Sequence, residues 1–256
     1  ISAPFLFMNY FLDTVESISA DVGFSLFDSI HVAWLLFFLA VTVLNCIWFC
    51  RMDADRRQKW KKAVALLLIA DELFKVIMLI IGGRYLAKYL PLHLCSINIF
   101  LIVIHAWKPV KVLNSFLYAV CIPGALAALL FPSWTSLPLQ NFMHLHSFTV
   151  HILLVMYPVV LTAGGELKPR AKDIPACLFL LIAMAFPIVG INFLLDTNFM
   201  FLMYPEEGNP LMWFAQNWGN HLYGFPVLIS AILLVMYLPV ELIIIVKRKR
   251  EQRIAK

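Results

Sequence analysis

The chain has 256 residues, of which 62% are apolar and only 14% are charged. Soluble domains carry roughly 25% charged residues, so this chain has too little polar surface to cover itself in water. The composition and the mean hydropathy of +0.85 argue against a soluble enzyme, a nucleic-acid-binding protein and a disordered chain. They predict an all-α, polytopic membrane protein with one helical membrane domain.

Seven apolar runs are long enough, at roughly 17–25 residues each, to cross a bilayer as helices. They cover residues 30–50, 63–81, 91–107, 112–131, 142–163, 174–195 and 223–246. We therefore predict a bundle of seven transmembrane helices over residues 28–246, preceded by a surface segment at 1–27 and followed by a basic tail at 247–256.

The basic residues predict how this bundle is oriented. Nearly all of the 20 Lys and Arg residues lie in alternate connections, at 51–62, 108–111 and 168–172, and in the tail. By the positive-inside rule the C-terminus is cytoplasmic and the N-terminus is outside. The tail is expected to attract anionic lipid headgroups. The apolar and aromatic residues 1–12 are expected to lie on the outer surface as an interfacial amphipathic helix.

Charged residues within an apolar run are costly unless they are paired. In the second run, Asp71 and Lys75 are four positions apart and therefore share a helix face. We expect them to form a structural ion pair, with Glu72 left on an adjacent face.

Most other polar residues of the apolar runs fall in the outer half of the predicted bundle. They are His93, Cys95, Asn98, His144, His146, His151, Asn192, Asp196, Asn198, Asn217, Asn220 and His221. At the helical rise, Cys95 lies roughly 6 Å and His151 roughly 13 Å inside their helices, so both belong to the outer leaflet half. The other four cysteines lie in apolar runs and are expected to be small buried side chains.

Three chemistries fit such a cluster. A Cys–His pair transfers acyl groups, with a thiolate as nucleophile and an imidazole as base. A His-rich cluster with Asp196 holds a metal, although these histidine spacings are not a specific metal signature. Chains of His, Asp and Asn relay protons or bind a transported solute. A single histidine can also simply bond a neighbouring carbonyl between helices. Composition and spacing leave these alternatives open.

Two motifs, LPLHLCSI at 90–97 and TNFMFLMYP at 197–205, resemble the YwaF-type family of bacterial integral membrane proteins. This resemblance runs from about Tyr89 to Pro239 and implies a helical topology in a bacterial cell membrane, with an endomembrane as the alternative location. More distantly, the chain is similar to animal transmembrane acyltransferases that remodel ether phospholipids. The shared features are a Cys at the start of the third helix, ALLFP at 128–132 and VHILLVMYP at 150–158. This similarity implies that Cys95 is a nucleophile and His151 a catalytic base.

We therefore predict acyl transfer or hydrolysis on a membrane phospholipid or fatty-acyl ester, without a metal, a cofactor or a nucleic-acid partner. Asn98 or a backbone N–H at the helix start would stabilise the oxyanion, and Asp196 or His144 would orient His151. The supporting residues are His93, Asn98, His144, Asp196 and Asn198. The alternative is a small-solute or proton binding and transport protein that uses the same outer-side cluster of His, Asn and Asp.

Overall fold

The structure, a computed structural model, describes residues 10–19, 22–206 and 209–254, and over these residues it contains helices and no strand. The helices are α2 (Ser29–Cys50), α3 (Ala54–Ile81), α4 (Leu94–Trp107), α5 (Lys111–Phe116), α6 (Ile122–Leu130), α7 (Phe142–Ala163), α8 (Ile174–Leu195), α9 (Pro210–Trp218) and α10 (Gly224–Ile254). A π-helical turn, η3 (Leu117–Cys121), joins α5 to α6, and short 3-10 turns η2, η4, η5 and η6 lie in the connections. The predicted all-α class is confirmed.

Six helical segments of the described residues are long and apolar enough to cross a membrane. They are Ser29–Cys50, Ala87–Trp107, Lys111–Leu130, Phe142–Ala163, Ala171–Leu195 and His221–Lys247. Helix α3 is also long, with 28 residues, but carries Asp71, Glu72 and Lys75 within its apolar stretch. Six of the seven predicted runs are therefore confirmed as candidate spans, and the crossing of α3 stays a prediction.

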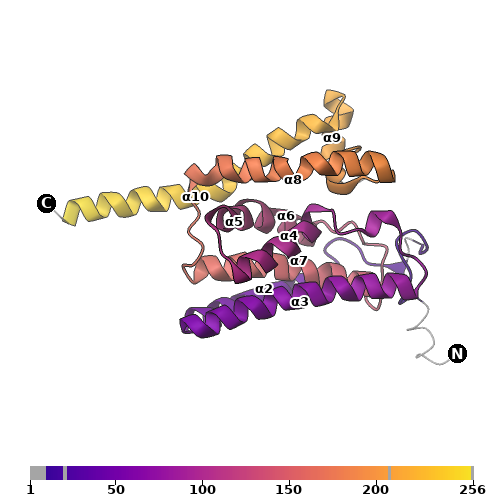
Figure 1. Cartoon of the computed structure of the whole chain (residues 1–256), viewed down its shortest axis with the longest axis horizontal. Helices are drawn as coiled ribbons and strands as arrows, with labels where there is room; N and C mark the ends of the chain where they lie inside the picture. The colour runs from indigo at the N-terminus through magenta and orange to yellow at the C-terminus, as the bar shows by residue number, and fades with distance from the viewer. Residues whose placement is uncertain (1–9, 20–21, 207–208, 255–256) are drawn as a thin grey trace.

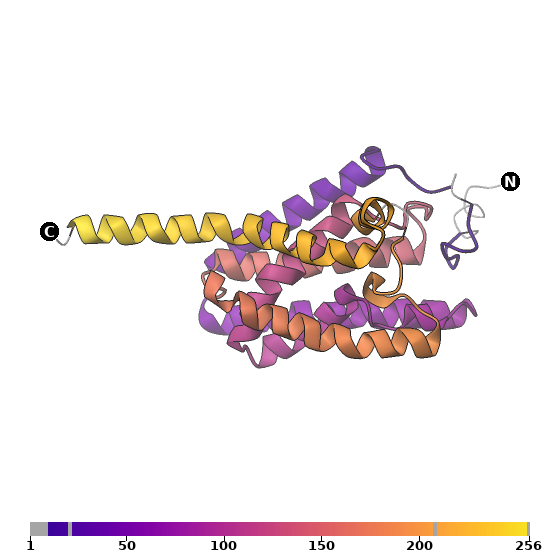
Figure 2. The same cartoon turned by 90° about the horizontal axis from the view of Figure 1, so that it is seen from above.

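Helix α7 packs against α2, α3 and α6 and occupies the middle of the bundle (Figure 1). Its Phe148, Leu154, Tyr157, Val160 and Leu161 are fully buried in the main apolar core. In contrast, α8 lies at the edge of the bundle, and α10 extends beyond it (Figures 1 and 2). Large apolar side chains of α8, among them Phe186 at 80% and Leu194 at 84%, face outward. Such a surface suits a lipid solvent rather than water.

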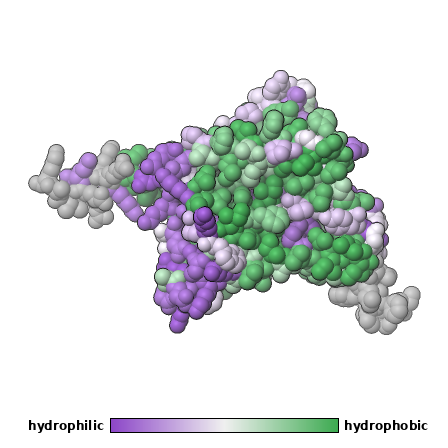
Figure 3. All heavy atoms as spheres, viewed as in Figure 1, coloured by the Kyte–Doolittle hydropathy of each residue, from purple (hydrophilic) through white to green (hydrophobic). Residues whose placement is uncertain are grey.

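The polar and basic side chains gather mainly at one end of the bundle, which we call the basic end (Figure 3). Here the α2–α3, α4–α5 and α7–α8 connections meet. Arg57 donates to Gly164 O at 3.0 Å, Lys61 Nζ lies 2.7 Å from Glu166 Oε2, and Gln58 donates to Ala106 O at 2.6 Å. These bonds bring together connections that are far apart in the sequence. We call the other end, where α4 and α7 begin, the α4-start end.

The described part of the N-terminal segment folds onto the α4-start end as turns. Asn141 caps α7 and donates to Tyr10 O at 2.6 Å and to Asp13 O at 2.8 Å. Phe24 N donates to Thr135 O at 2.8 Å, and Gly23 fits there because a Cβ would lie 1.8 Å from that oxygen. The predicted interfacial helix over 1–12 falls mainly on residues 1–9, which lie outside the described residues.

Glu16 attaches this segment to the connection between α3 and α4, where Lys88 and Tyr89 donate hydrogen bonds to its carboxylate. Burial alone would raise the pKa of Glu16, but the bonds from Lys88, Thr14 and Tyr89 outweigh it and lower the pKa from 4.5 to about 2. A depressed carboxyl pKa stabilises the folded form above the unfolded pKa, and this contribution is lost as the pH falls through the folded value.

We therefore expect the segment at residues 10–19 to loosen as the pH falls from 4.5 to about 2. Hydrogen exchange of these amides, corrected for the intrinsic rate, measures this effect. Glu16→Gln should give a segment whose protection no longer changes over the same interval. Equal pH dependence in the wild type and the variant would contradict the assignment.

Candidate functional site

Cys95 lies in the first turn of α4, one position after the helix begins at Leu94. It is half-buried and packs against the main apolar core. Cys121 and Cys177 are buried as expected, but Cys46 is only half-buried and Cys50 is exposed at the end of α2. The expectation of burial was wrong for Cys50 because an apolar run does not tell which face of its helix points outward.

The start of α4 presents unpaired backbone donors around the Cys95 thiol. The first backbone bond of the helix runs from Ile97 N to His93 O at 3.0 Å. His93 is the N-cap residue but makes no side-chain capping bond. Among the described residues, the N–H groups of Leu94, Cys95 and Ser96 have no partner in another residue. Free N–H groups and the positive end of the helix dipole favour a negative charge at this point.

His151 lies on α7 with one ring nitrogen fixed and the other left open. Its Nδ1 is 2.6 Å from Ser147 O, and a carbonyl oxygen only accepts, so Nδ1 carries the proton. The Nε2 atom therefore presents its lone pair. The ring stacks on Trp134, with centroids 5.2 Å apart and planes 16° apart. These two contacts hold the imidazole in one orientation, as a general base requires.

The two residues belong to neighbouring parts of the same packed region. The Cys121 thiol donates to Leu154 O at 3.4 Å, and Leu154 lies one turn along α7 from His151. Cys95 packs against the same apolar core that contains Cys121 and Trp134, and His151 stacks on Trp134. Among the hydrogen bonds of the described residues, none joins Cys95 directly to His151. Both residues therefore contact the main core without a direct bond between them.

Asn98 is one turn beyond Cys95 and is only 2% exposed. Its Oδ1 atom is buried without a hydrogen-bond partner within the described part of the chain. An unpaired buried amide is costly and usually has a reason, such as a ligand that completes its bonding. Asn98 is therefore the polar side chain next to Cys95 whose bonding capacity is unused.

His144 and His93 both make contacts that fix the fold. His144 Nδ1 is 2.9 Å from Leu137 O, and its Nε2 accepts from Trp34 Nε1 at 2.9 Å, so both ring nitrogens are occupied. His93 Nδ1 accepts from Met200 N at 3.4 Å, and its ring lies edge-on to Phe199. His144 ties α7 to α2, whereas His93 ties α4 to the segment that follows α8.

The segment that follows α8, residues 196–204, is a hairpin that is held by hydrogen bonds and covers the start of α4. Asn192 Oδ1 accepts from Phe199 N at 2.8 Å, and its Nδ2 donates to Phe199 O at 3.0 Å. Asn198 accepts from Met203 N and donates to Tyr204 O. Asp196 ends α8 with a left-handed φ of 50° and an exposed side chain. Asp196 and Asn198 thus shape this hairpin.

The hairpin also stores backbone strain above the α4 start. Met200 and Phe201 adopt φ values of 59° and 57°, in a region that disfavours side chains other than Gly, Asn and Asp. Phe199 and Met200 are nonetheless buried against Leu94 and Ile97 of α4. Burial of these apolar side chains offsets the unfavourable backbone geometry, so packing holds the hairpin over Cys95's turn.

A largely apolar pocket of about 560 Å³ adjoins this hairpin. Its lining residues are Val189, Phe193, Leu202, Met203, Ala215, Gly219, Asn220, His221 and Leu222. Leu202 also packs against the cluster that covers the start of α4. His221 Nε2 is buried and has no hydrogen-bond partner among the described residues. The pocket therefore combines mainly apolar lining residues with two polar ones, Asn220 and His221.

A separate buried network joins α3 to α7. Asp71 accepts from Thr149 Oγ1 at 2.6 Å and lies 3.3 Å from His146 Nδ1. Lys75 Nζ lies 2.5 Å from Glu72 Oε1. The predicted Asp71–Lys75 pair is therefore wrong, because Lys75 pairs with Glu72 and Asp71 faces α7. The spacing of residues along α3 does not reveal the polar residues of α7.

No group of three or more His, Cys, Asp or Glu side chains able to hold a metal occurs in the described ranges.

The sequence profile of the TMEM164 family matches residues 26–237. The chain belongs to the TMEM164 family. It is an integral membrane protein with a helical fold. No curated protein and no solved structure matches it. The resemblances to YwaF-type proteins and to ether-phospholipid acyltransferases stay predictions.

Several residues that shape this TMEM164-family site were not among the predicted site residues. Trp134, which stacks on His151, lies in a short loop without a periodic pattern. Cys121 looked like an ordinary core residue, although its thiol donates to Leu154 O of α7. Thr149 gave a usable signal, because a hydroxyl one turn from His146 on an apolar helix points to a buried partner.

We expect Asn192→Ala to loosen the hairpin without unfolding this TMEM164-family chain. The change removes the bonds that Asn192 makes to the N–H and the C=O of Phe199, at a cost of about 1–3 kcal/mol. Hydrogen exchange at residues 196–204 should rise, and a mass-tagged thiol reagent should reach Cys95 faster. Asn217→Ala is the matched control, since Asn217 makes an exposed bond within α9. Equal effects of the two changes would contradict this role.

Proposed function

We propose that this protein transfers or hydrolyses the acyl chain of a membrane phospholipid or fatty-acyl ester, with Cys95 and His151 as the reacting pair. The observation that carries the proposal is the fixed imidazole of His151, whose Nδ1 donates to Ser147 O at 2.6 Å and leaves Nε2 free to take a proton. The half-buried thiol of Cys95 in a neighbouring helix turn supplies the nucleophile.

In the first step, His151 Nε2 takes the proton of the Cys95 thiol, and Sγ attacks the carbonyl carbon of the ester. The ester C–O bond breaks, and the leaving alcohol oxygen receives the proton from His151. The acyl chain is then held on Cys95 as a thioester. In the second step, the hydroxyl of an acceptor lipid or of water gives its proton to His151 and attacks the thioester. The C–S bond breaks, and the thiol regains its proton.

The negative charge that develops on the carbonyl oxygen needs donors that are already in place. The free N–H groups of Cys95 and Ser96 at the start of α4 are such donors. The amide of Asn98 lies one turn deeper and, among the described residues, has no partner at its Oδ1. Because Oδ1 only accepts, it is the Nδ2 group of Asn98 that is a second candidate donor to the oxyanion.

The lipid nature of the substrate is supported by the surroundings of the α4 start. The pocket of about 560 Å³ beside the hairpin has mainly apolar walls and shares Leu202 with the cluster that covers Leu94 and Ile97. An acyl chain in this pocket would bury its apolar surface close to the thiol. The polar lining residues Asn220 and His221 would then contact the polar part of the ligand.

We also infer that α3 crosses the membrane together with the six other spans, with the N-terminus outside and the C-terminus in the cytoplasm. The bonds of Arg57, Gln58 and Lys61 bring three basic connections together at one end, which fits the positive-inside rule. In this orientation Cys95 opens toward the outer leaflet.

The direct test uses Cys95→Ala and His151→Gln in membranes supplied with phospholipid carrying a labelled acyl chain. We expect each variant to lose acyl transfer or release by about a hundredfold or more, because both nucleophile and base are needed. Release of labelled product is measured by chromatography.

Matched controls are Cys177→Ala, which removes a buried thiol of α8, and His105→Gln, which changes an imidazole bonded to Tyr157 and Asn114. These two variants should keep nearly the wild-type rate. Wild-type activity in both Cys95→Ala and His151→Gln would overturn the proposal.

A second candidate function is favoured by the buried network of α3 and α7. Glu72 Oε2 has no hydrogen-bond partner within the described part of the chain and lies 3.8 Å from His146 Nε2. The network sets the carboxylates of Asp71 and Glu72 against the single ammonium of Lys75. Uptake of one proton or small cation would balance this charge, so binding or transport of protons is the alternative.

We expect Asp71→Asn to abolish proton entry into reconstituted vesicles if this alternative is correct, because it removes one of the two carboxylates. An internal pH-sensitive dye measures the rate. Asp55→Asn, at an exposed pair with Lys59 near the start of α3, is the control. Wild-type vesicles that acidify no faster than protein-free vesicles would rule the alternative out.

A further inference from the structure

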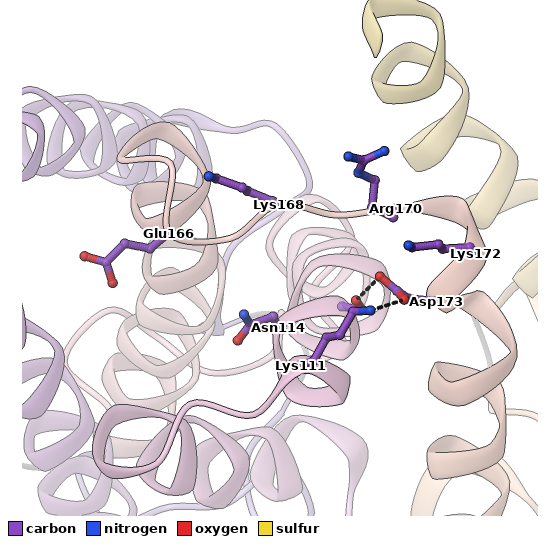
Figure 4. Close-up of a pocket in the computed structure, with 8 residues that line it drawn as sticks. Lys111, Asn114, Glu166, Lys168, Arg170, Lys172 and Asp173 are labelled. Carbon is purple, nitrogen blue, oxygen red and sulfur yellow. Dashed lines mark hydrogen bonds and ion pairs between the residues drawn. The ribbon is translucent and has the colours of Figure 1, made fainter. Parts of the chain in front are cut away.

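At the basic end, opposite to Cys95, the structure contains a second pocket of about 330 Å³ (Figure 4). It lies between the start of α5 and the connection from α7 to α8. Its lining residues are Lys111, Asn114, Ser115, Glu166, Lys168, Arg170, Lys172 and Asp173. Four cationic and two acidic side chains therefore share one small concave surface.

The two acidic side chains of this pocket are already paired. Glu166 lies 2.7 Å from Lys61 Nζ and 3.8 Å from Arg57 Nη1, both of which belong to α3. Asp173 lies 3.3 Å from Lys111 Nζ and also accepts from Ser115 Oγ at 3.4 Å. The negative charge on the pocket wall is thus neutralised by cations that are not Lys168, Arg170 or Lys172.

The remaining three cations have no carboxylate within ion-pair distance in the described ranges, and Arg170 is half-buried. Asn114 adds a neutral donor, since its Oδ1 accepts from His105 Nε2 at 2.8 Å and its amide hydrogens remain for a ligand. A guanidinium fork, two ammonium groups and an amide form a donor set that suits a phosphate group.

The position of the pocket fits a ligand at a membrane surface. It lies where the spans Lys111–Leu130 and Ala171–Leu195 both begin, at the junction of the apolar bundle and its basic end. Ala171 N donates to Glu241 Oε1 of α10 at 2.9 Å, which fixes the connection that carries Arg170 and Lys172. Basic pockets between helices at this level attract anionic headgroups.

We propose that this pocket binds a phosphate monoester, with Lys168, Arg170 and Lys172 as its cationic ligands. The same chemistry is available from the headgroup of a membrane lipid or from a soluble phosphate ester. The site is separate from the proposed Cys95–His151 chemistry, because the two lie at opposite ends of α4. It does not depend on whether that proposal is correct.

The test uses the full chain in neutral detergent micelles and isothermal titration calorimetry. The probes are short-chain phosphatidic acid, glycerol 3-phosphate and, as a neutral control, short-chain phosphatidylcholine. The pocket variant carries K168Q, R170Q and K172Q. The matched control carries R56Q, K59Q and K62Q, which remove the same types and number of charges at the same end of the bundle.

We expect phosphatidic acid to bind the wild type and the pocket variant to lose about tenfold or more in affinity. The control variant should stay within about twofold, because none of its three residues lines the pocket. Binding of glycerol 3-phosphate with similar affinity supports a soluble ester as ligand. Binding of phosphatidic acid alone supports a lipid headgroup.

Equal losses in the two triple variants would overturn the proposal, because they would indicate general electrostatic attraction to the basic end. Absence of binding to the wild type, or equally tight binding of phosphatidylcholine, would overturn it too. If the triple pocket variant does not fold, as judged by thermal unfolding, R170K replaces it. That change keeps the charge but removes the planar fork, so a clear loss of affinity is still expected.

Discussion

Helix α7 lies in the apolar middle of the bundle, and yet it carries three histidines together with Thr149. Each of them is bonded within the protein: His144 to Trp34 and Leu137, His146 and Thr149 to Asp71, and His151 to Ser147. In an apolar solvent an unpaired polar group costs several kcal/mol. This need for internal partners ties α7 to α2 and α3 and fixes the rotation of each ring. The proposed base is oriented by the same constraint that orders the core.

The two ends of the TMEM164-family bundle have different chemistry as a consequence. At the α4-start end, the bonded hairpin after α8 covers a free helix start, a thiol and an apolar pocket, which together suit an acyl ester. At the basic end, Lys61 of α3 and Lys111 of α5 neutralise the acidic side chains of a concave surface and leave unpaired cations among the described residues, which suit a phosphate. A phospholipid contains both an acyl ester and a phosphate. At each end of the bundle, the corresponding one of these is matched by protein groups whose own hydrogen-bonding capacity is unused.

Much of this fold could be predicted from the sequence, because apolar runs of bilayer length have few alternatives to a helix. The predicted runs at 142–163 and 174–195 coincide with α7 and α8, whose ends are set by the Asn141 cap and by the left-handed Asp196. Helix α3 begins nine residues earlier than its apolar run, at Ala54 after the Asp53 cap, because its first turns are polar. The partner of Asp71 could not be predicted, since Lys75 is its neighbour in sequence but α7 is its neighbour in space. For the same reason, the stacking of Trp134 on His151 depends on a loop whose position no periodicity encodes.

The measurement that tests the account most directly is mass spectrometry of the protein after brief incubation with phospholipid carrying a labelled acyl chain. If Cys95 is the nucleophile, the peptide that contains it should gain the mass of the acyl chain, and hydroxylamine should remove this mass because it cleaves thioesters. His151→Gln should prevent the modification while Cys95 remains in place. An acyl chain found on another residue, or acyl transfer that proceeds while the Cys95 peptide stays unmodified, would contradict the account.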